Sequence, residues 1–274
     1  MKANKFEIIT IIITIITVVF IVIGGLFVSK HAVSNRRAVV SEIPATKSII
    51  PSVELKTNTI APLVDNNITF SGIDAKYIPP SEQSIIALAG SNEDFDGIIS
   101  FKNNIASYPV VRSSDLSYLS KDFYGNENAA GVPCLINSDS IDLNKADNKT
   151  CNMIVFANSL KSGELFSNLY KYQNIEYTKS HNRIEYTTMF GTYEFEVMSA
   201  FTAPYVSEGE RGFRFDQFYQ TTKIGEFNDF YDNIMGLNAC TTGVLAELGD
   251  DFITLITYID SSQKQCMVVI GKLL

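Results

Sequence analysis

The sequence predicts a mainly β protein, in which a closed β-barrel with peripheral helices follows an N-terminal transmembrane helix. Three observations lead to this prediction. Short strand-like runs occupy most of the chain after residue 94, few stretches repeat apolar residues at helical spacing, and one long apolar run lies near the N-terminus. Many short strands with few helices on their connections are typical of a closed barrel with helices outside it.

The long apolar run covers Ile8–Val28 and contains no charged residue. It is long enough to cross a bilayer as a helix, and it is longer than the apolar region of a usual cleaved signal peptide. We therefore expect a signal anchor at 8–28, preceded by a short cytoplasmic segment at 1–7. Positive charges lie on both sides of the run, so charge alone does not decide its orientation.

The charge of the chain is divided unevenly. Residues 1–37 contain five Lys and Arg residues against one Glu, a net charge of +4, so the rest must carry −12 to give the total of −8. A domain this acidic is not expected to bind nucleic acid or an anionic bilayer by charge.

Residues 29–80 are predicted to form a stalk, because prolines recur among Ser, Thr and Asn without a sustained apolar period. A compact domain is expected from residue 81 to residue 274. Its predicted strands are Phe95–Phe101, Tyr108–Val111, Gly131–Asn137, Met153–Phe156, Arg183–Phe190, Tyr193–Val197, Asp250–Thr257 and Met267–Leu273. Gly191-Thr192 is predicted as the two-residue turn of a hairpin.

Three helices are predicted in the same domain. A short one covers Ser81–Ala89, and the longest covers Ile224–Met235, where apolar residues repeat at a period of 3.6. Between them, the helical spacing of Leu165, Leu169 and their neighbours predicts a helix for which Ser162 is placed to cap the N-terminus.

Cysteine and histidine are scarce. The four cysteines (Cys134, Cys151, Cys240 and Cys266) have no C-x-x-C spacing, so the sequence predicts neither a zinc site nor a cofactor, and it leaves disulfides open. The two histidines are His31, near the predicted anchor, and His181, in a polar turn that we expect at the surface.

Two segments carry a resemblance to a known family. They are Met153–Leu160 (Met-Ile-Val-Phe-Ala-Asn-Ser-Leu) and the C-terminal pair Ile253–Tyr258 and Cys266–Leu273. Together with Tyr108-Pro109-Val110-Val111, and with order kept from about residue 94 to residue 274, they resemble the class B sortases. These are membrane-anchored cysteine transpeptidases of Gram-positive bacteria, and the resemblance implies a sortase barrel on the outer side of the membrane.

The resemblance implies that three positions of this sequence differ from the residues of the family. In the family a histidine follows the first of these strands, a cysteine ends a Thr-Leu-Ser-Thr-Cys strand, and an arginine opens the last strand. Asn158, Tyr258 and Cys266 occupy these places. A sortase cuts its peptide through a cysteine thioester, which needs a thiolate, an acid for the leaving amine and a donor for the oxyanion.

None of the three residues is suited to the catalytic role that the resemblance implies for its position. The phenol of Tyr258 is a poor acyl-transfer nucleophile, and we expect its ring to fill the vacated pocket. An amide at Asn158 cannot transfer protons near neutral pH, so it either forms a turn or binds a peptide. Cys266 is predicted to be packed and inert, with a displaced nucleophile as the alternative.

Further side chains are candidates for lining a peptide groove: Ser159, Arg211, Arg214 and Thr257. The two arginines lie in a loop that we expect to be charged and solvated, and that corresponds to a wall of the groove in the family.

The leading hypothesis is a catalytically impaired class B sortase homologue at the cell membrane, single-pass, with its C-terminal domain extracellular. It would bind sorting-signal peptides, a surface protein or an active sortase. The first alternative is an active cysteine transpeptidase with an unorthodox centre at Asn158, Tyr258 and Cys266. The second is a structural envelope protein whose groove has collapsed.

Overall fold

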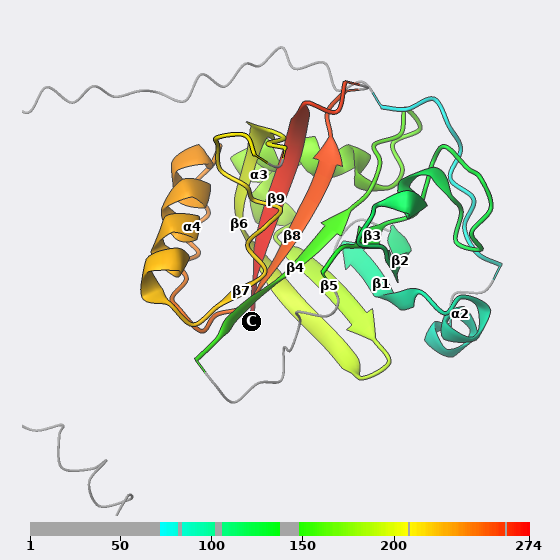
Figure 1. Ribbon diagram of the computed structural model, residues 1–274, viewed down its shortest axis with the longest axis horizontal. Helices are drawn as coiled ribbons and strands as arrows, with labels where there is room; N and C mark the ends of the chain where they lie inside the picture. The colour runs from blue at the N-terminus through cyan, green and yellow to red at the C-terminus, as the bar shows by residue number, and fades with distance from the viewer. Residues whose placement is uncertain (1–71, 82–83, 102–105, 138–147, 208, 261) are drawn as a thin grey trace, which may run out of the picture. The chain divides into compact units, whose positions relative to one another are not determined.

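The computed structural model describes residues 72–81, 84–101, 106–137, 148–207, 209–260 and 262–274 (Figure 1). The predicted cytoplasmic segment, the anchor at 8–28 and most of the stalk therefore lie outside the described residues. Within the ranges just given, no helix has both the length and the apolar character that crossing a membrane requires.

A closed barrel of eight strands forms the centre of the domain (Figure 1). The strands pair in the order β3-β2-β1-β5-β6-β9-β8-β4, and β4 pairs back to β3; β7 adds to the outer edge of β4. Most pairs are antiparallel, but β4 runs parallel to β8 and β2 parallel to β3. The strands are β1 Phe95–Phe101, β2 Ser107–Arg112, β3 Cys134–Leu135, β4 Thr150–Phe156, β5 Arg183–Thr188, β6 Gly191–Pro204, β7 Gln220–Thr221, β8 Phe252–Tyr258 and β9 Gln265–Leu273. The predicted mainly β barrel with peripheral helices is thus confirmed.

Both faces of the central strands are buried. Along β4, Val155 points into the barrel, where it packs with Leu255 and Val269, whereas Ile154 and Phe156 belong to a second apolar cluster on the outside. All seven residues of β4 are accordingly buried. A strand buried on both faces gives a continuous apolar run without alternation, which is what the sequence has at Met153–Phe156.

Helix α4 (Ile224–Leu237) covers the outer cluster with Phe227, Phe230 and Ile234. Helix α2 (Ile85–Ser91) begins after the predicted start at Ser81, because Ser84 is the residue whose hydroxyl accepts from the Ala87 amide. The remaining helical segments are η1 Ser117–Ser120, η3 Phe166–Gln173 and α3 Ile175–Ser180.

Two local predictions were wrong in detail. The helix expected near Leu165 is the 3₁₀ helix η3, and the Ser162 hydroxyl bonds to the Glu164 carboxylate instead of capping it. The hairpin turn consists of Met189 and Phe190, because Gly191 is the first residue of β6 and already pairs with Thr188.

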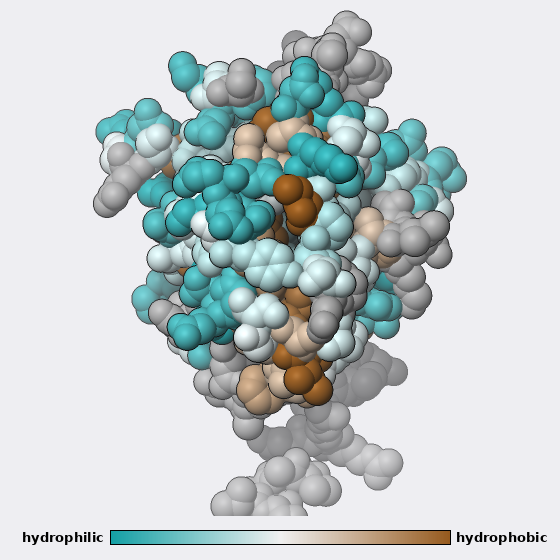
Figure 2. Space-filling model, turned by 90° about the vertical axis from the view of Figure 1, so that its right-hand side faces the viewer, coloured by the Kyte–Doolittle hydropathy of each residue, from teal (hydrophilic) through white to brown (hydrophobic). Residues whose placement is uncertain are grey.

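Part of the predicted stalk packs on the barrel. The Ile73 amide donates to the Ser159 carbonyl at 2.7 Å, and Tyr77 is buried with its ring 5.5 Å from that of Tyr108. The packed part of the domain therefore begins before residue 81. On the face drawn in Figure 2, apolar side chains form small patches among polar ones, as on the surface of most folded domains.

Candidate functional site

Strand pairing brings the three substituted positions to one end of the barrel. Tyr258 is the last residue of β8 and lies directly opposite Cys266 on β9. Strand β4 runs parallel to β8 with Phe156 beside Ile256, so Asn158 leaves the sheet at the same end. The backbone therefore places Asn158, Tyr258 and Cys266 at the same end of the barrel.

The Asn158 side chain holds a neighbouring loop. Its Nδ2 donates to the carbonyls of Leu119 at 2.7 Å, Ala130 at 3.1 Å and Ala129 at 3.3 Å, and only 7% of the residue is exposed. The amide donors are thus used to tie the segment 119–130 to the end of β4. An amide in this setting stabilises the fold and offers no acid or base.

Tyr258 is packed among aromatic rings. Its ring centroid lies 5.7 Å from that of Tyr205, edge to face, and 6.0 Å from that of Phe156. Burial, followed by the neighbouring Tyr205 and Cys266, raises the pKa of the Tyr258 phenol well above its ordinary value. The phenol therefore stays protonated at neutral pH.

Cys266 is fully buried, with 0% of its surface exposed. Burial, together with the negative charges of Asp216 and Asp260, raises the pKa of its thiol to about 12. The thiol therefore stays protonated at neutral pH, whereas the thiolate is the reactive form.

A buried carboxylate, Asp216, also belongs to this end of the barrel. It is 3% exposed and accepts from Arg214 Nη2 at 3.4 Å and from Gln217 Nε2 at 3.2 Å. Asp216 also contributes to the raised pKa values of Tyr205 and Tyr258, after burial. Sequence reasoning missed Asp216 and Tyr205; the only signal was a single acidic residue between Phe215 and Phe218.

The predicted groove residues divide into two pairs. Arg211 is exposed, whereas Arg214 is partly buried in the ion pair with Asp216. Ser159 and Thr257 are 3% and 0% exposed, and neither hydroxyl has a hydrogen-bond partner among the described residues. Thr257 lies between Leu255 and Ile259, whose side chains belong to the barrel core. That these four residues line a groove stays a prediction.

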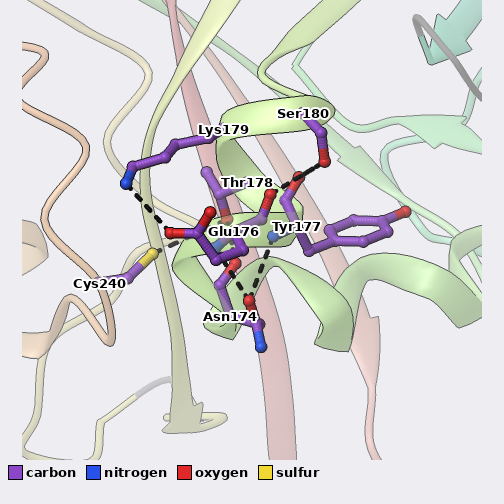
Figure 3. A network of polar contacts seen from close by, with 7 residues as sticks. All are labelled: Asn174, Glu176, Tyr177, Thr178, Lys179, Ser180 and Cys240. Atoms are coloured by element: carbon purple, nitrogen blue, oxygen red, sulfur yellow. Dashed lines mark hydrogen bonds and ion pairs between the residues drawn. The ribbon is translucent and has the colours of Figure 1, made fainter.

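His181 and a further cysteine, Cys240, lie beside α3. The ring of His181 stacks on Tyr177 at 4.0 Å, and Cys240 Sγ donates to the Tyr172 carbonyl at 3.3 Å. Figure 3 shows Cys240 directed at Thr178, whose Oγ1 lies 3.8 Å from the sulfur. Both residues are thus engaged with the helical segments η3 and α3.

No disulfide joins the four cysteines, all of which the structure describes. Nor does any group of three or more His, Cys, Asp or Glu side chains in the described ranges come together to hold a metal ion.

An eight-stranded barrel with β4, β8 and β9 side by side, and with the three substituted positions at one end, defines a sortase-type fold. No family model matches the chain. It is 27% identical to sortase B of Listeria monocytogenes over 187 residues, which cover 66% of this chain and 70% of that protein.

Solved structures agree with this relationship. A Staphylococcus aureus sortase B–substrate complex superposes with a TM-score of 0.58 at 20% identity, covering 69% of this chain and 84% of that one. Sortase B of Bacillus anthracis in complex with AAEK1 gives a TM-score of 0.57 at 25% identity, covering 72% and 88%. The chain is thus similar to the class B sortases in both sequence and fold.

Proposed function

We propose that this chain is a catalytically impaired class B sortase homologue that binds peptides or a surface-assembly partner instead of cleaving them. One observation carries the proposal: at the three positions where the family has histidine, cysteine and arginine, this chain has Asn158, Tyr258 and a buried Cys266. The proposal concerns chemistry, since the barrel itself is that of the family.

Each side chain argues against transpeptidation for a separate reason. Asn158 cannot exchange protons near neutral pH, and its amide donors are engaged with backbone carbonyls. Tyr258 is a protonated phenol enclosed by other rings. Cys266 is a protonated thiol without access to solvent, so the alternative of an unorthodox cysteine centre would require it to become exposed and ionised.

The location belongs to the same proposal. The apolar run Ile8–Val28 would anchor the protein in the membrane of a Gram-positive cell, with the barrel outside. Residues between the anchor and the barrel would act as the spacer.

A specific observation favours a second candidate, a structural envelope protein. Tyr258, Tyr205 and Phe156 pack against one another at the place where a peptide would meet the nucleophile. If these rings stay in place, a peptide cannot reach that end of the groove.

A binding experiment separates the two candidates. The full chain in lipid nanodiscs is titrated into fluorescent sorting-motif peptides, and fluorescence anisotropy is measured. Saturable binding without cleavage supports the peptide-binding function. Equal binding of a matched scrambled peptide, or no binding of either peptide, would favour the structural envelope protein instead.

A gain-of-function variant tests whether the peptide groove is retained. The triple change Asn158→His, Tyr258→Cys and Cys266→Arg restores the residue types of the family. Measurable peptide cleavage by this variant supports a retained groove. A folded but silent variant would count against it.

A further inference from the structure

A polar cavity of about 510 Å³ lies away from the substituted catalytic positions. Its floor includes Asn137, which donates to the Asn152 carbonyl at 2.7 Å and accepts from the Ile154 amide at 2.9 Å. The cavity therefore sits beside the middle of β4, whereas Asn158 lies two residues beyond the last residue of that strand, Phe156. The lining residues are Asp94, Arg112, Ser113, Ser114, Asp115, Ser117, Tyr118, Ile136, Asn137 and Tyr219.

Two carboxylates of the cavity are held in fixed positions by neutral donors. Asp94 Oδ2 accepts from the Tyr118 hydroxyl at 2.9 Å. Asp115 Oδ1 accepts from the Ser113 hydroxyl at 2.9 Å and from the Ser117 amide at 3.0 Å. Because these donors are uncharged, they orient the two carboxylates without neutralising them.

The one cation of the lining is already engaged. Arg112 Nη1 lies 3.8 Å from the carboxylate of Asp96, which is not part of the lining, and Nη2 donates to the Glu93 carbonyl. The charge of Arg112 is thus compensated outside the cavity. Two negative charges remain inside it, and a bound group must carry positive charge to balance them.

The floor of the cavity adds apolar surface. Ile136 and Tyr219 are half-buried and pack against the outer apolar cluster while lining the cavity. An apolar floor below carboxylates suits a side chain with a hydrocarbon stem and a cationic end. A metal ion would fill little of about 510 Å³, whereas a basic side chain with its flanking backbone fits this volume.

We propose that this cavity is a docking site for a basic side chain, lysine or arginine, on a partner polypeptide. The stem lies on Ile136 and Tyr219, and the cationic end lies between Asp94 and Asp115. The serine hydroxyls of the rim are placed to bond the flanking backbone. This site is separate from the one on which the proposed function rests, so either can fail without the other.

The test uses saturation-transfer NMR on the full chain in neutral-lipid nanodiscs. The probe is acetyl-Gly-Lys-Gly-amide, and its matched control is acetyl-Gly-norleucine-Gly-amide, which keeps the stem and lacks the charge. We expect saturation of the lysine probe, strongest at its ε-methylene, and at least about tenfold weaker binding of the norleucine probe, since a charge-assisted hydrogen bond is lost.

A pair of variants assigns the binding to this cavity. Asp94→Asn with Asp115→Asn removes both charges and keeps acceptors for Tyr118, Ser113 and Ser117, so the fold is retained; its thermal unfolding checks this. We expect about tenfold weaker binding of the lysine probe. Asp229→Asn on α4, away from this lining, removes one acidic charge and serves as the control that leaves binding unchanged.

Four results would overturn the proposal. The norleucine probe could bind as well as the lysine probe, the double variant could bind like the native chain, or Asp229→Asn could weaken binding as much as the double variant does. Saturation of N-acetylglucosamine without saturation of the lysine probe would also contradict it, because the cavity would then be a saccharide site.

Discussion

Tyr258 and Cys266 face each other across β8 and β9, and their surroundings decide how they behave. The ring of Tyr258, at the end of β8, packs with those of Tyr205 and Phe156. Cys266, near the start of β9, is covered completely.

The positions of these residues could be predicted from the sequence, but their contacts could not. The strand motifs fix which residue ends β8 and which follows β4. The Asn158 amide bonds to Leu119 and Ala130, which precede it by 39 and 28 residues. No local sequence pattern predicts these contacts. Asp216 was missed for another reason: its partners Arg214 and Gln217 are close in sequence, but its burial is not visible in the sequence.

Thiol labelling tests the burial of the individual cysteines directly. In the folded chain we expect Cys240, which is half-buried, to react first with a thiol reagent, and the fully buried Cys266 to stay unmodified over the same time. Peptide mapping by mass spectrometry identifies each site. Unfolding in denaturant should make all four cysteines react alike. Early labelling of Cys266 in the native chain would mean that its sulfur reaches solvent.

At the scale of elements, the strands with clear patterns were predicted best. Phe95–Phe101 was predicted with the observed bounds, and the alternation that begins at Tyr193 marks part of β6. Strand β3 is only Cys134–Leu135, because the run around it pairs for just two residues with β2 and β4. Pairing length depends on neighbouring strands, which are distant in sequence.

Helix α4 owes its position to packing rather than to capping. Lys223 precedes it without a capping hydrogen bond from its side chain, while Phe230 is 3% exposed and stacks on Phe218 with ring centroids 3.9 Å apart. The apolar stripe was therefore the right signal for this helix, and its end at Leu237 lies two residues beyond the predicted one.

Truncating the stripe should loosen this element. Phe230→Ala should lower the free energy of unfolding by about 3–5 kcal/mol, because it leaves a cavity between α4 and β8. Ile224→Ala, at an exposed position of the same helix, should change it by less than about 0.5 kcal/mol. Urea unfolding followed by circular dichroism measures both. Equal effects of the two variants would contradict the packing described for α4.

For the whole molecule, buried thiols link stability to alkaline pH. The pKa values of Cys134 and Cys266 are raised by burial to about 12, from about 9 in the unfolded chain. The folded state therefore holds these protons more tightly. Their contribution to stability is complete below about pH 9 and is lost as the pH rises through about 12.

This linkage can be measured in one variant. Between about pH 9 and pH 12, each of these thiols should lower the free energy of unfolding by roughly 1.4 kcal/mol per pH unit. Cys266→Ala should make the pH dependence shallower by about that amount, while buried tyrosines other than its neighbours Tyr205 and Tyr258 act equally in both proteins. Urea unfolding over a pH series gives the two slopes. Identical slopes would mean that Cys266 ionises in the folded chain as it does in the unfolded one.

The same molecule thus combines a sortase-like barrel with a site that we propose to be catalytically impaired. The barrel could be predicted from the strand patterns of the sequence, and the comparison with sortase B proteins agrees with this fold. The protonation states of Tyr258 and Cys266 depend on burial and on neighbouring groups, which only the structure reveals.

Intact mass spectrometry of the full chain with a sorting-motif peptide is the most direct measurement of this central claim. A working transpeptidase would gain the mass of the acyl fragment as a thioester and would release the C-terminal part of the peptide. We predict an unchanged protein mass and an intact peptide. An acyl adduct on Cys266 that disappears in Cys266→Ala would contradict the account.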